Sequence, residues 1–236
     1  KIFGSASYSV YQRIIYLVRL LKGGYFSING LDKKLEKYVN YDDGFFVELG
    51  ANDGVSQSNT LYFEIKRNWK GVLVEPSPHN FQKCIQQRSK RNSIFCNACV
   101  GFDYKEKYVD IKYADLMTIS DNLELDLIDK ESHINAAKEI LKNKEDRVFS
   151  FGASARTLNS LLEESNAPKL IDFLSLDVEG AELEVLKGIN FHKYKFKFIL
   201  IEVRNFQRIN SFLEQKNYFL EKKFSVHDYL FKSFET

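Results

Sequence analysis

The sequence predicts an α/β protein whose mostly parallel sheet is covered by helices on both faces. Three observations lead to this class. Short apolar segments of strand-like composition recur along the chain, and segments of helical pattern separate them. Several of the apolar segments also end at or beside an acidic residue, as in Glu48, Glu75 and Asp177. In parallel sheets such strand ends border the ligand crevice.

Composition limits the classes of partner. The 236 residues are 44% hydrophobic, which is enough for one domain with its own core and excludes disorder. Lys and Arg number 34 and Asp and Glu 32, so the net charge of +2 gives no overall attraction to nucleic acid, and we expect no such partner. The odd, sparse cysteine count fits the reducing cytoplasm better than a disulfide framework.

The first element is a helix expected over residues 10–21, where Val10, Ile14, Leu17, Val18 and Leu21 share one face. Arg13 and Arg19 interrupt this stretch, and it is too short to span a bilayer. We therefore expect no membrane span. We assign residues 1–42 to an N-terminal helical extension and residues 43–236 to the main domain.

The main domain alternates between strands and helices. Strands are expected over residues 44–49, 70–75, 93–98, 170–177 and 196–203. Helices are expected between them over residues 58–66, 80–88, 158–164 and 182–187. Residues 218–224 and 228–232 are typical of a terminal strand pair that need not be parallel to the rest.

Residues 104–150 interrupt this alternation and are predicted to be a helical insertion, with its strongest helix over residues 121–144. Two interpretations remain open: a solvated helix that caps the sheet, or a lid or substrate wall, because insertions at the carboxyl ends of parallel strands line the ligand crevice. The insertion also carries aromatic and acidic side chains that suit a sugar, namely Tyr104, Tyr108, Tyr113, Asp115 and Asp121.

A glycine-containing loop follows the first strand. Gly50 and Gly54 are spaced G-x-x-x-G rather than in the G-x-G-x-x-G pattern of dinucleotide-binding proteins. Glu48 lies two residues before the first glycine, where a carboxylate repels phosphates and suits a cationic ligand. This loop therefore disfavours NAD.

A second acid, Glu75, closes the second strand 21 residues after Gly54. An acid at this position binds ribose hydroxyls in nucleoside-binding α/β folds. An adenosine with a cationic tail that lacks phosphate is S-adenosylmethionine, so Glu48 and Glu75 together favour this cofactor. The alternative is that both are ordinary solvated strand ends.

A third acidic group closes the fourth strand. Asp177 and Glu179 are suited to act as general base, to hold a divalent metal such as Mg²⁺, or to bind substrate hydroxyls. Glu182 begins the next helix, where capping is the simpler interpretation.

The order and spacing of these motifs resemble the FkbM-type S-adenosylmethionine-dependent methyltransferases over residues 43–232. The matching segments are residues 46–60, 71–78, 156–158, 176–183 and 199–203. The stretch Ser58-Asn59-Thr60, with Trp69 and Arg88, is similar to one branch of that family. Glu48 stands where the family commonly has Asp, which keeps the charge and lengthens the reach.

The resemblance implies a Rossmann-like class I methyltransferase fold, with a seven-stranded sheet that has one antiparallel edge strand. It implies S-adenosylmethionine as methyl donor and a hydroxyl acceptor. The cofactor-binding residues that it implies are Glu48, Gly50, Ala51, Asn52, Asp53, Gly54, Ser58, Asn59, Glu75, Pro76, Asn97, Ala98, Cys99 and Asp177. Asp177 and Glu179 would face the acceptor, and His227 is the alternative base.

We therefore expect an O-methyltransferase that acts on a sugar hydroxyl of a glycan, a surface polysaccharide or a glycosylated metabolite. Mg²⁺, held by Asp177 and Glu179, is an optional Lewis acid. Two alternatives stay open: an inactive binding module with this fold, and transfer to an acceptor that is not a sugar. The intact acids Glu48, Glu75 and Asp177 argue against the inactive module. The oligomeric state is left open.

Overall fold

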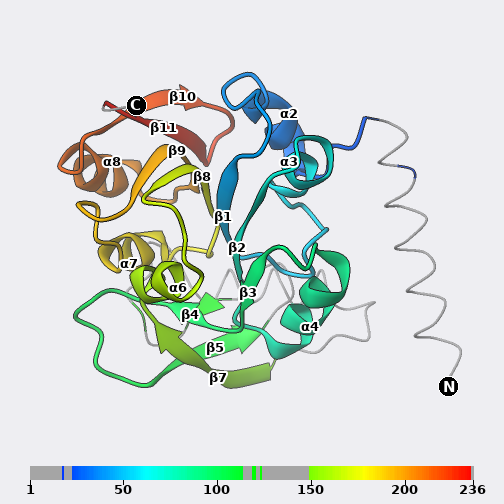
Figure 1. Cartoon of the computed structure of the whole chain (residues 1–236). Helices are drawn as coiled ribbons and strands as arrows, with labels where there is room; N and C mark the ends of the chain where they lie inside the picture. The colour runs from blue at the N-terminus through cyan, green and yellow to red at the C-terminus, as the bar shows by residue number, and fades with distance from the viewer. Residues whose placement is uncertain (1–17, 19–22, 114–118, 121–122, 124–148, 235–236) are drawn as a thin grey trace, which may run out of the picture.

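The computed structural model describes residues 18, 23–113, 119–120, 123 and 149–234 (Figure 1). Its main sheet has seven strands: β1 (Phe45–Leu49), β2 (Lys70–Val74), β3 (Ser93–Phe95), β8 (Leu170–Leu176), β9 (Lys195–Glu202), β10 (Tyr218–Lys223) and β11 (Asp228–Ser233). Their order is β10-β11-β9-β8-β1-β2-β3. β11 runs antiparallel to its neighbours β9 and β10, and the other pairs are parallel. The predicted mostly parallel, seven-stranded sheet is confirmed.

The central strands are apolar because both faces of the sheet are buried. In β1, Val47 and Leu49 join one core, whereas Phe46 joins the other. In β8, Leu174 packs with the first core and Phe173 with the second. The alternating side chains of each strand therefore supply two separate apolar layers.

Helices cover each layer. Those on the first face are α6 (Leu158–Glu164), α7 (Glu182–Lys187) and α8 (Phe206–Glu214), and those on the second are α2 (Leu31–Leu35), α3 (Leu61–Lys66) and α4 (Pro78–Gln87). Figure 1 shows the two groups on opposite sides of the sheet. No helix within the described ranges is both long and apolar enough to cross a bilayer.

The described part of residues 1–42 packs on the sheet. A short 3-10 turn, η1 (Ile28–Gly30), leads into α2, where Leu31 and Leu35 are buried. Asp32 is fully buried and accepts hydrogen bonds from the backbone N–H groups of Phe26 and Ser27. Apart from Val18, the helix predicted over residues 10–21 lies outside the described residues.

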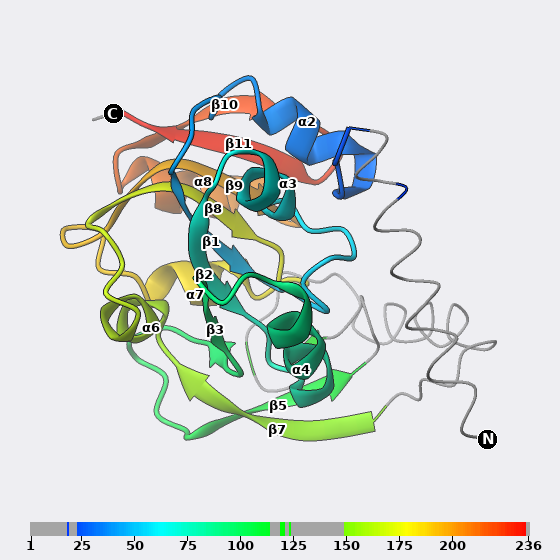
Figure 2. The ribbon, with the colours of Figure 1, turned by 45° about the vertical axis from the view of Figure 1, so that its right-hand side comes forward.

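A second sheet stands where the helical insertion was expected. Its strands are β4 (Ala98–Cys99), β5 (Tyr108–Tyr113), β6 (Ile119–Ser120) and β7 (Phe149–Arg156), in the order β4-β7-β5-β6. The views in Figures 1 and 2 place β5 beside β7. The helical prediction is therefore wrong for residues 108–113, 119–120 and 149–150. Over residues 108–113 the sequence Y-V-D-I-K-Y alternates with a period of two, as a strand does. Apart from Leu123, the helix predicted over residues 121–144 lies outside the described residues.

Candidate active site

A cavity of about 480 Å³ lies at the carboxyl ends of the central strands. The last residues of β1, β2, β8 and β9, namely Leu49, Val74, Leu176 and Glu202, all line it. Its volume is within the range of small-molecule sites, roughly 300–1,000 Å³. The location is the one where open α/β sheets bind their ligands.

The cavity brings together most of the predicted site residues. Those that line it are Glu48, Gly50, Asn52, Ser58, Asn59, Glu75, Pro76, Asn97, Ala98, Cys99, Asp177, Glu179 and His227. Ala51, Asp53 and Gly54 do not line it. Asp53 instead shapes the loop, because its Oδ1 accepts the N–H groups of Val55 at 2.9 Å and Ser56 at 2.7 Å.

Gly50 allows the backbone to turn out of β1 while lying close to the backbone at the end of β8. Its φ is +76°, and a Cβ there would lie 2.0 Å from the backbone oxygen of Asp177. The N–H groups of Gly50 and Ala51 both donate to the carbonyl of Val74 at 3.1 Å. No other residue type fits both this conformation and this space.

Replacing Gly50 by Ala is expected to destabilise the protein and to weaken binding of S-adenosylhomocysteine. The left-handed conformation alone costs about 1–2 kcal/mol for a residue with a Cβ, and the clash with Asp177 adds to it. Thermal unfolding and calorimetry measure the two effects. Gly30→Ala is the control: Gly30 has a φ of +63°, but a Cβ at this position would meet nothing within 4 Å. Equal losses in both variants would contradict the close-approach argument.

Glu48 does not present an unpaired charge to the cavity. It is 4% exposed, and its Oε2 lies 3.0 Å from Nη1 of Arg88. The same carboxylate accepts hydrogen bonds from the hydroxyls of Ser58 and Thr60 and from the N–H of Asn59. From the sequence, this charge was expected to meet a cationic ligand, but in the structure Arg88 compensates it within the protein.

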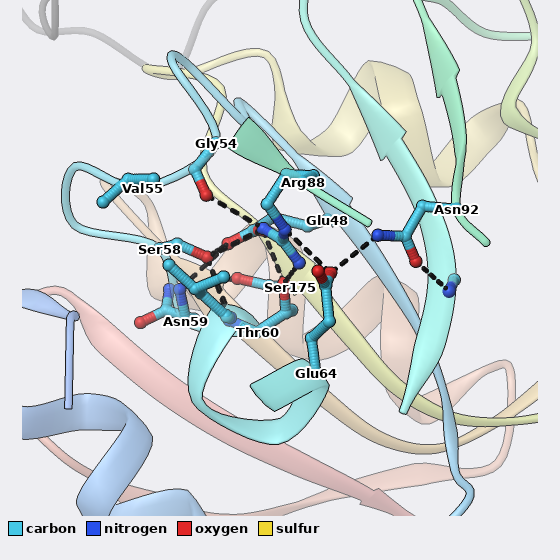
Figure 3. A network of polar contacts seen from close by, with 12 residues as sticks. Glu48, Gly54, Val55, Ser58, Asn59, Thr60, Glu64, Arg88, Asn92 and Ser175 are labelled. Atoms are coloured by element: carbon cyan, nitrogen blue, oxygen red, sulfur yellow. Dashed lines mark hydrogen bonds and ion pairs between the residues drawn. The ribbon is translucent and has the colours of Figure 1, made fainter. Parts of the chain in front are cut away.

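Arg88 is the centre of a buried polar network beneath the glycine loop (Figure 3). Its Nε donates to Glu64 at 2.9 Å, and its Nη1 donates to the carbonyl of Gly54 at 3.2 Å. Its Nη2 donates to the hydroxyl of Thr60 at 2.9 Å. One side chain thus joins the glycine loop, the Ser58-Asn59-Thr60 turn, α3 and the end of α4.

Glu75 is held at the end of β2 by two backbone groups. Its Oε2 accepts the N–H of Asn52 at 2.8 Å, and its Oε1 accepts the N–H of Ser77 at 2.9 Å. A carboxylate oxygen has lone pairs for more than one hydrogen bond. Glu75 can therefore keep both contacts while it binds hydroxyls of a ligand in the cavity.

Asp177, Glu179 and Glu202 form a carboxyl cluster, in which one carboxylate oxygen of each residue lies within 4.8 Å of the others. Asp177 is exposed and lines the cavity, with Glu202 close beside it. The surrounding protein displaces much of the water around Asp177, and this dehydration, with the charges of Glu202 and Glu179, raises its pKa well above the usual range. Burial and Glu202 raise the pKa of Glu179 to about 7. Asp177 and Glu179 therefore stay protonated to a higher pH than isolated carboxyl groups do.

Arg204 balances part of this charge. Its Nη2 lies 3.2 Å from Oε2 of Glu179 and 2.6 Å from Oε1 of Glu202. Glu182 stands apart from the cavity lining: its Oε1 accepts the N–H groups of Val178 and Gly180, which supports the capping interpretation. Burial raises the pKa of Glu182 to about 7.

His227 lies in the turn before β11 and lines the cavity. Its Nδ1 is 3.3 Å from the carbonyl oxygen of Val203. Glu202 and Asn80 also line the cavity, although the sequence argument assigned neither to the site. Glu202 could have been predicted from the sequence, because it closes a strand as Glu75 does. Asn80 lies inside a helix and carried no such signal.

The strand order, the single antiparallel strand β11 and a ligand cavity at the strand ends define a class I S-adenosylmethionine-dependent methyltransferase fold. Residues 48–224 match the family model described as Methyltransferase FkbM domain. The chain belongs to this family. No curated protein matches its sequence.

The solved structures that have some likeness to this chain include three methyltransferase or fibrillarin structures. TrmK from M. capricolum, solved with S-adenosyl-homocysteine, is 11% identical with a TM-score of 0.40; the match covers 85% of this chain and 65% of that chain. Precorrin-6y C5,15-methyltransferase from Geobacter metallireducens GS-15 is 11% identical with a TM-score of 0.40 and 86% coverage of both chains. A fibrillarin/Nop5p complex is 12% identical with a TM-score of 0.36, covering 80% of this chain and 71% of that chain. These low values carry no argument about substrate.

Proposed function

We propose that this protein is an O-methyltransferase that transfers a methyl group from S-adenosylmethionine to a sugar hydroxyl of a glycan, a surface polysaccharide or a glycosylated metabolite. The observation that carries the proposal is the cluster of three carboxyl groups, Asp177, Glu179 and Glu202, in the cavity beside Gly50. A sugar hydroxyl is a weak acid, so its methylation needs a proton acceptor within hydrogen-bond reach.

The residues present fit the cofactor. The close backbone approach at Gly50 and the carboxylate of Glu75 supply a narrow turn and a partner for ribose hydroxyls at adjacent strand ends. Glu75 and Pro76 would hold the ribose, and Asn97, Ala98 and Cys99 would border the adenine. Gly50, Asn52, Ser58, Asn59 and Asp177 would surround the methionine end, and Glu48 would act through the loop that it anchors. When bound, S-adenosylmethionine supplies an electrophilic methyl group.

Asp177 is the base in this proposal. Its carboxylate accepts the proton of the acceptor hydroxyl, and the neighbouring charge of Glu202 helps to raise its pKa. Dehydration, the main cause of its raised pKa, makes this carboxylate a stronger proton acceptor than one in water. His227, also at the cavity, is the alternative base.

The carboxyl cluster does not fit a resident Mg²⁺. Carboxylate oxygens are ligands that Mg²⁺ prefers, but Arg204 already pairs with Glu179 and Glu202. A cation would have to displace this guanidinium. Turnover that EDTA abolishes and Mg²⁺ restores would reverse this assignment.

The cavity walls suit a sugar, which has both C–H faces and hydroxyl groups. Val109 and Ile111 of β5 supply apolar surface, and Ser225 and Asp228 supply polar groups near His227. The expected contribution of Tyr108 is not supported, because strand alternation turns its side chain outward, where it is 60% exposed.

A screen of acceptor classes tests the proposal directly. Labelled S-adenosylmethionine is offered with sugars and glycans, nucleic acids, peptides and small phenols. Transfer to a glycan hydroxyl supports the proposal. Transfer only to nucleic acid or to peptide nitrogen contradicts it, and cofactor binding without transfer to any class favours an inactive binding module.

Replacing Glu75 by Ala is expected to weaken binding of S-adenosylhomocysteine by about 1–3 kcal/mol, because ribose hydroxyls lose their partner. Calorimetry measures the change. NAD is expected to bind the wild type much more weakly than S-adenosylhomocysteine. Equal affinity for the two ligands would contradict the cofactor assignment.

A further inference from the structure

The first turn of α4 carries a buried asparagine that lines the cavity. Asn80 is 2% exposed and lines the cavity together with Glu75 and Pro76. Within the described part of the chain, its Oδ1 has no hydrogen-bond partner. Buried polar atoms are nearly always paired, because an unpaired one loses its hydration without compensation. The position therefore points to a partner that enters the cavity.

Capping of α4 does not account for this amide. Asn80 is the third residue of the helix, from which a polar side chain often reaches back to the N–H of the N-cap residue. Here that residue is Ser77, and its N–H already donates to Oε1 of Glu75 at 2.9 Å. The hydroxyl of Ser77 makes no capping hydrogen bond either. Glu75 has taken over the contact that would otherwise use Asn80.

The strand order places Asn80 on the nucleobase side of the cavity. Along the sequence of strands β8-β1-β2, the strand ends carry Asp177, Gly50 and Glu75 in that order. If the methionine end lies at Gly50 and the ribose at Glu75, the base continues in the same direction, toward β3. Asn80 follows Glu75 on α4, and Asn97 follows β3 on the same side.

We propose that Asn80 recognises the adenine base of the cofactor through a pair of hydrogen bonds. Its Oδ1 accepts the exocyclic amino group, and its Nδ2 donates to the adjacent ring nitrogen. An asparagine amide presents an acceptor beside a donor, which matches this edge of adenine. The inference rests on the proposed function, in that S-adenosylmethionine is the ligand of this cavity.

Two ligands that differ at one group test the inference. S-adenosylhomocysteine carries the exocyclic amino group, and S-inosylhomocysteine carries a carbonyl oxygen in its place. By calorimetry, the wild type is expected to bind the adenosyl compound about tenfold more tightly, the equivalent of one well-formed hydrogen bond. Asn80→Ala is expected to bind the adenosyl compound about tenfold more weakly than the wild type and to lose the discrimination.

Ser77→Ala is the matched control, since Ser77 is buried at the same helix end but does not line the cavity. It should keep the wild-type discrimination. Asn80→Leu, which retains the side-chain volume, replaces Asn80→Ala if that variant fails to fold by circular dichroism. If the Asn80 variants keep the discrimination, or lose affinity for both ligands equally, the inference about Asn80 is overturned. The proposed function is not affected by either result. A wild type that binds neither ligand overturns the proposed function as well.

Discussion

Asp177→Asn is expected to lower methyl-transfer turnover by about 10²–10⁴-fold, the usual effect of removing a general base. The substitution keeps the shape of the side chain but removes its capacity to take a proton. Affinity for S-adenosylhomocysteine should stay near that of the wild type. Because a base acts only in its deprotonated form, the wild-type rate should rise with pH as Asp177 loses its proton. Its raised pKa moves this rise above the usual carboxyl range.

Glu182→Gln is the control for this experiment. Glu182 is a buried acid five residues from Asp177, but it does not line the cavity, and a glutamine oxygen can accept the same two N–H groups. Its turnover should stay close to that of the wild type. An Asp177→Asn enzyme with a near-normal rate would exclude Asp177 as base and leave His227 as the candidate.

Arg88→Met is expected to lower the free energy of unfolding by about 3–5 kcal/mol, because it leaves buried carboxylates without their partner. Glu48 and Glu64 are 4% and 8% exposed, so water cannot replace the guanidinium. Urea unfolding measures the change. The glycine loop also loses the contact to the carbonyl of Gly54, so affinity for S-adenosylhomocysteine should fall too.

Two further variants separate charge from packing. Lys90→Ala, at a nearby position outside the network, should change stability by less than about 0.5 kcal/mol. Combining Arg88→Met with Glu48→Gln and Glu64→Gln should recover part of the lost stability, since it removes the unpaired charges. If Arg88→Met cost no more than Lys90→Ala, the network in Figure 3 would not stabilise the fold.

The sequence predicted the strands of the main sheet because strands buried on both faces are continuous apolar runs. Residues 44–49 and 170–177 are such runs, and β1 and β8 begin and end within one residue of them. α8 was not predicted, although Ile209 and Leu213 bury one of its faces. β5 was assigned to a helical insertion because its alternation is only six residues long and adjoins a stretch of helical composition.

The part of the candidate site that lies at strand ends was predictable, because the carboxyl ends of parallel strands meet at one edge of the sheet. This rule placed Glu75 and Asp177 at the cavity, and applied once more it would have included Glu202. The pairing of Glu48 was not predictable, because its partner Arg88 lies 40 residues away on another element. Charge at a position is visible in a sequence, but the neighbour that neutralises it is not.

Successive side chains of β5 alternate between the cavity and the opposite side of its sheet, so the register of this strand determines the chemistry of one cavity wall. Val109 and Ile111 face the cavity, whereas Tyr108 and Asp110 on the same strand are exposed on the other side. Deleting one residue before β5 would exchange the two sets while leaving Glu75 and Asp177 in place. A wall of this kind can change from aliphatic to aromatic and acidic in a single genetic step. Under the proposed function, such a change would alter the wall that meets the acceptor and leave the residues proposed to hold the methyl donor unchanged.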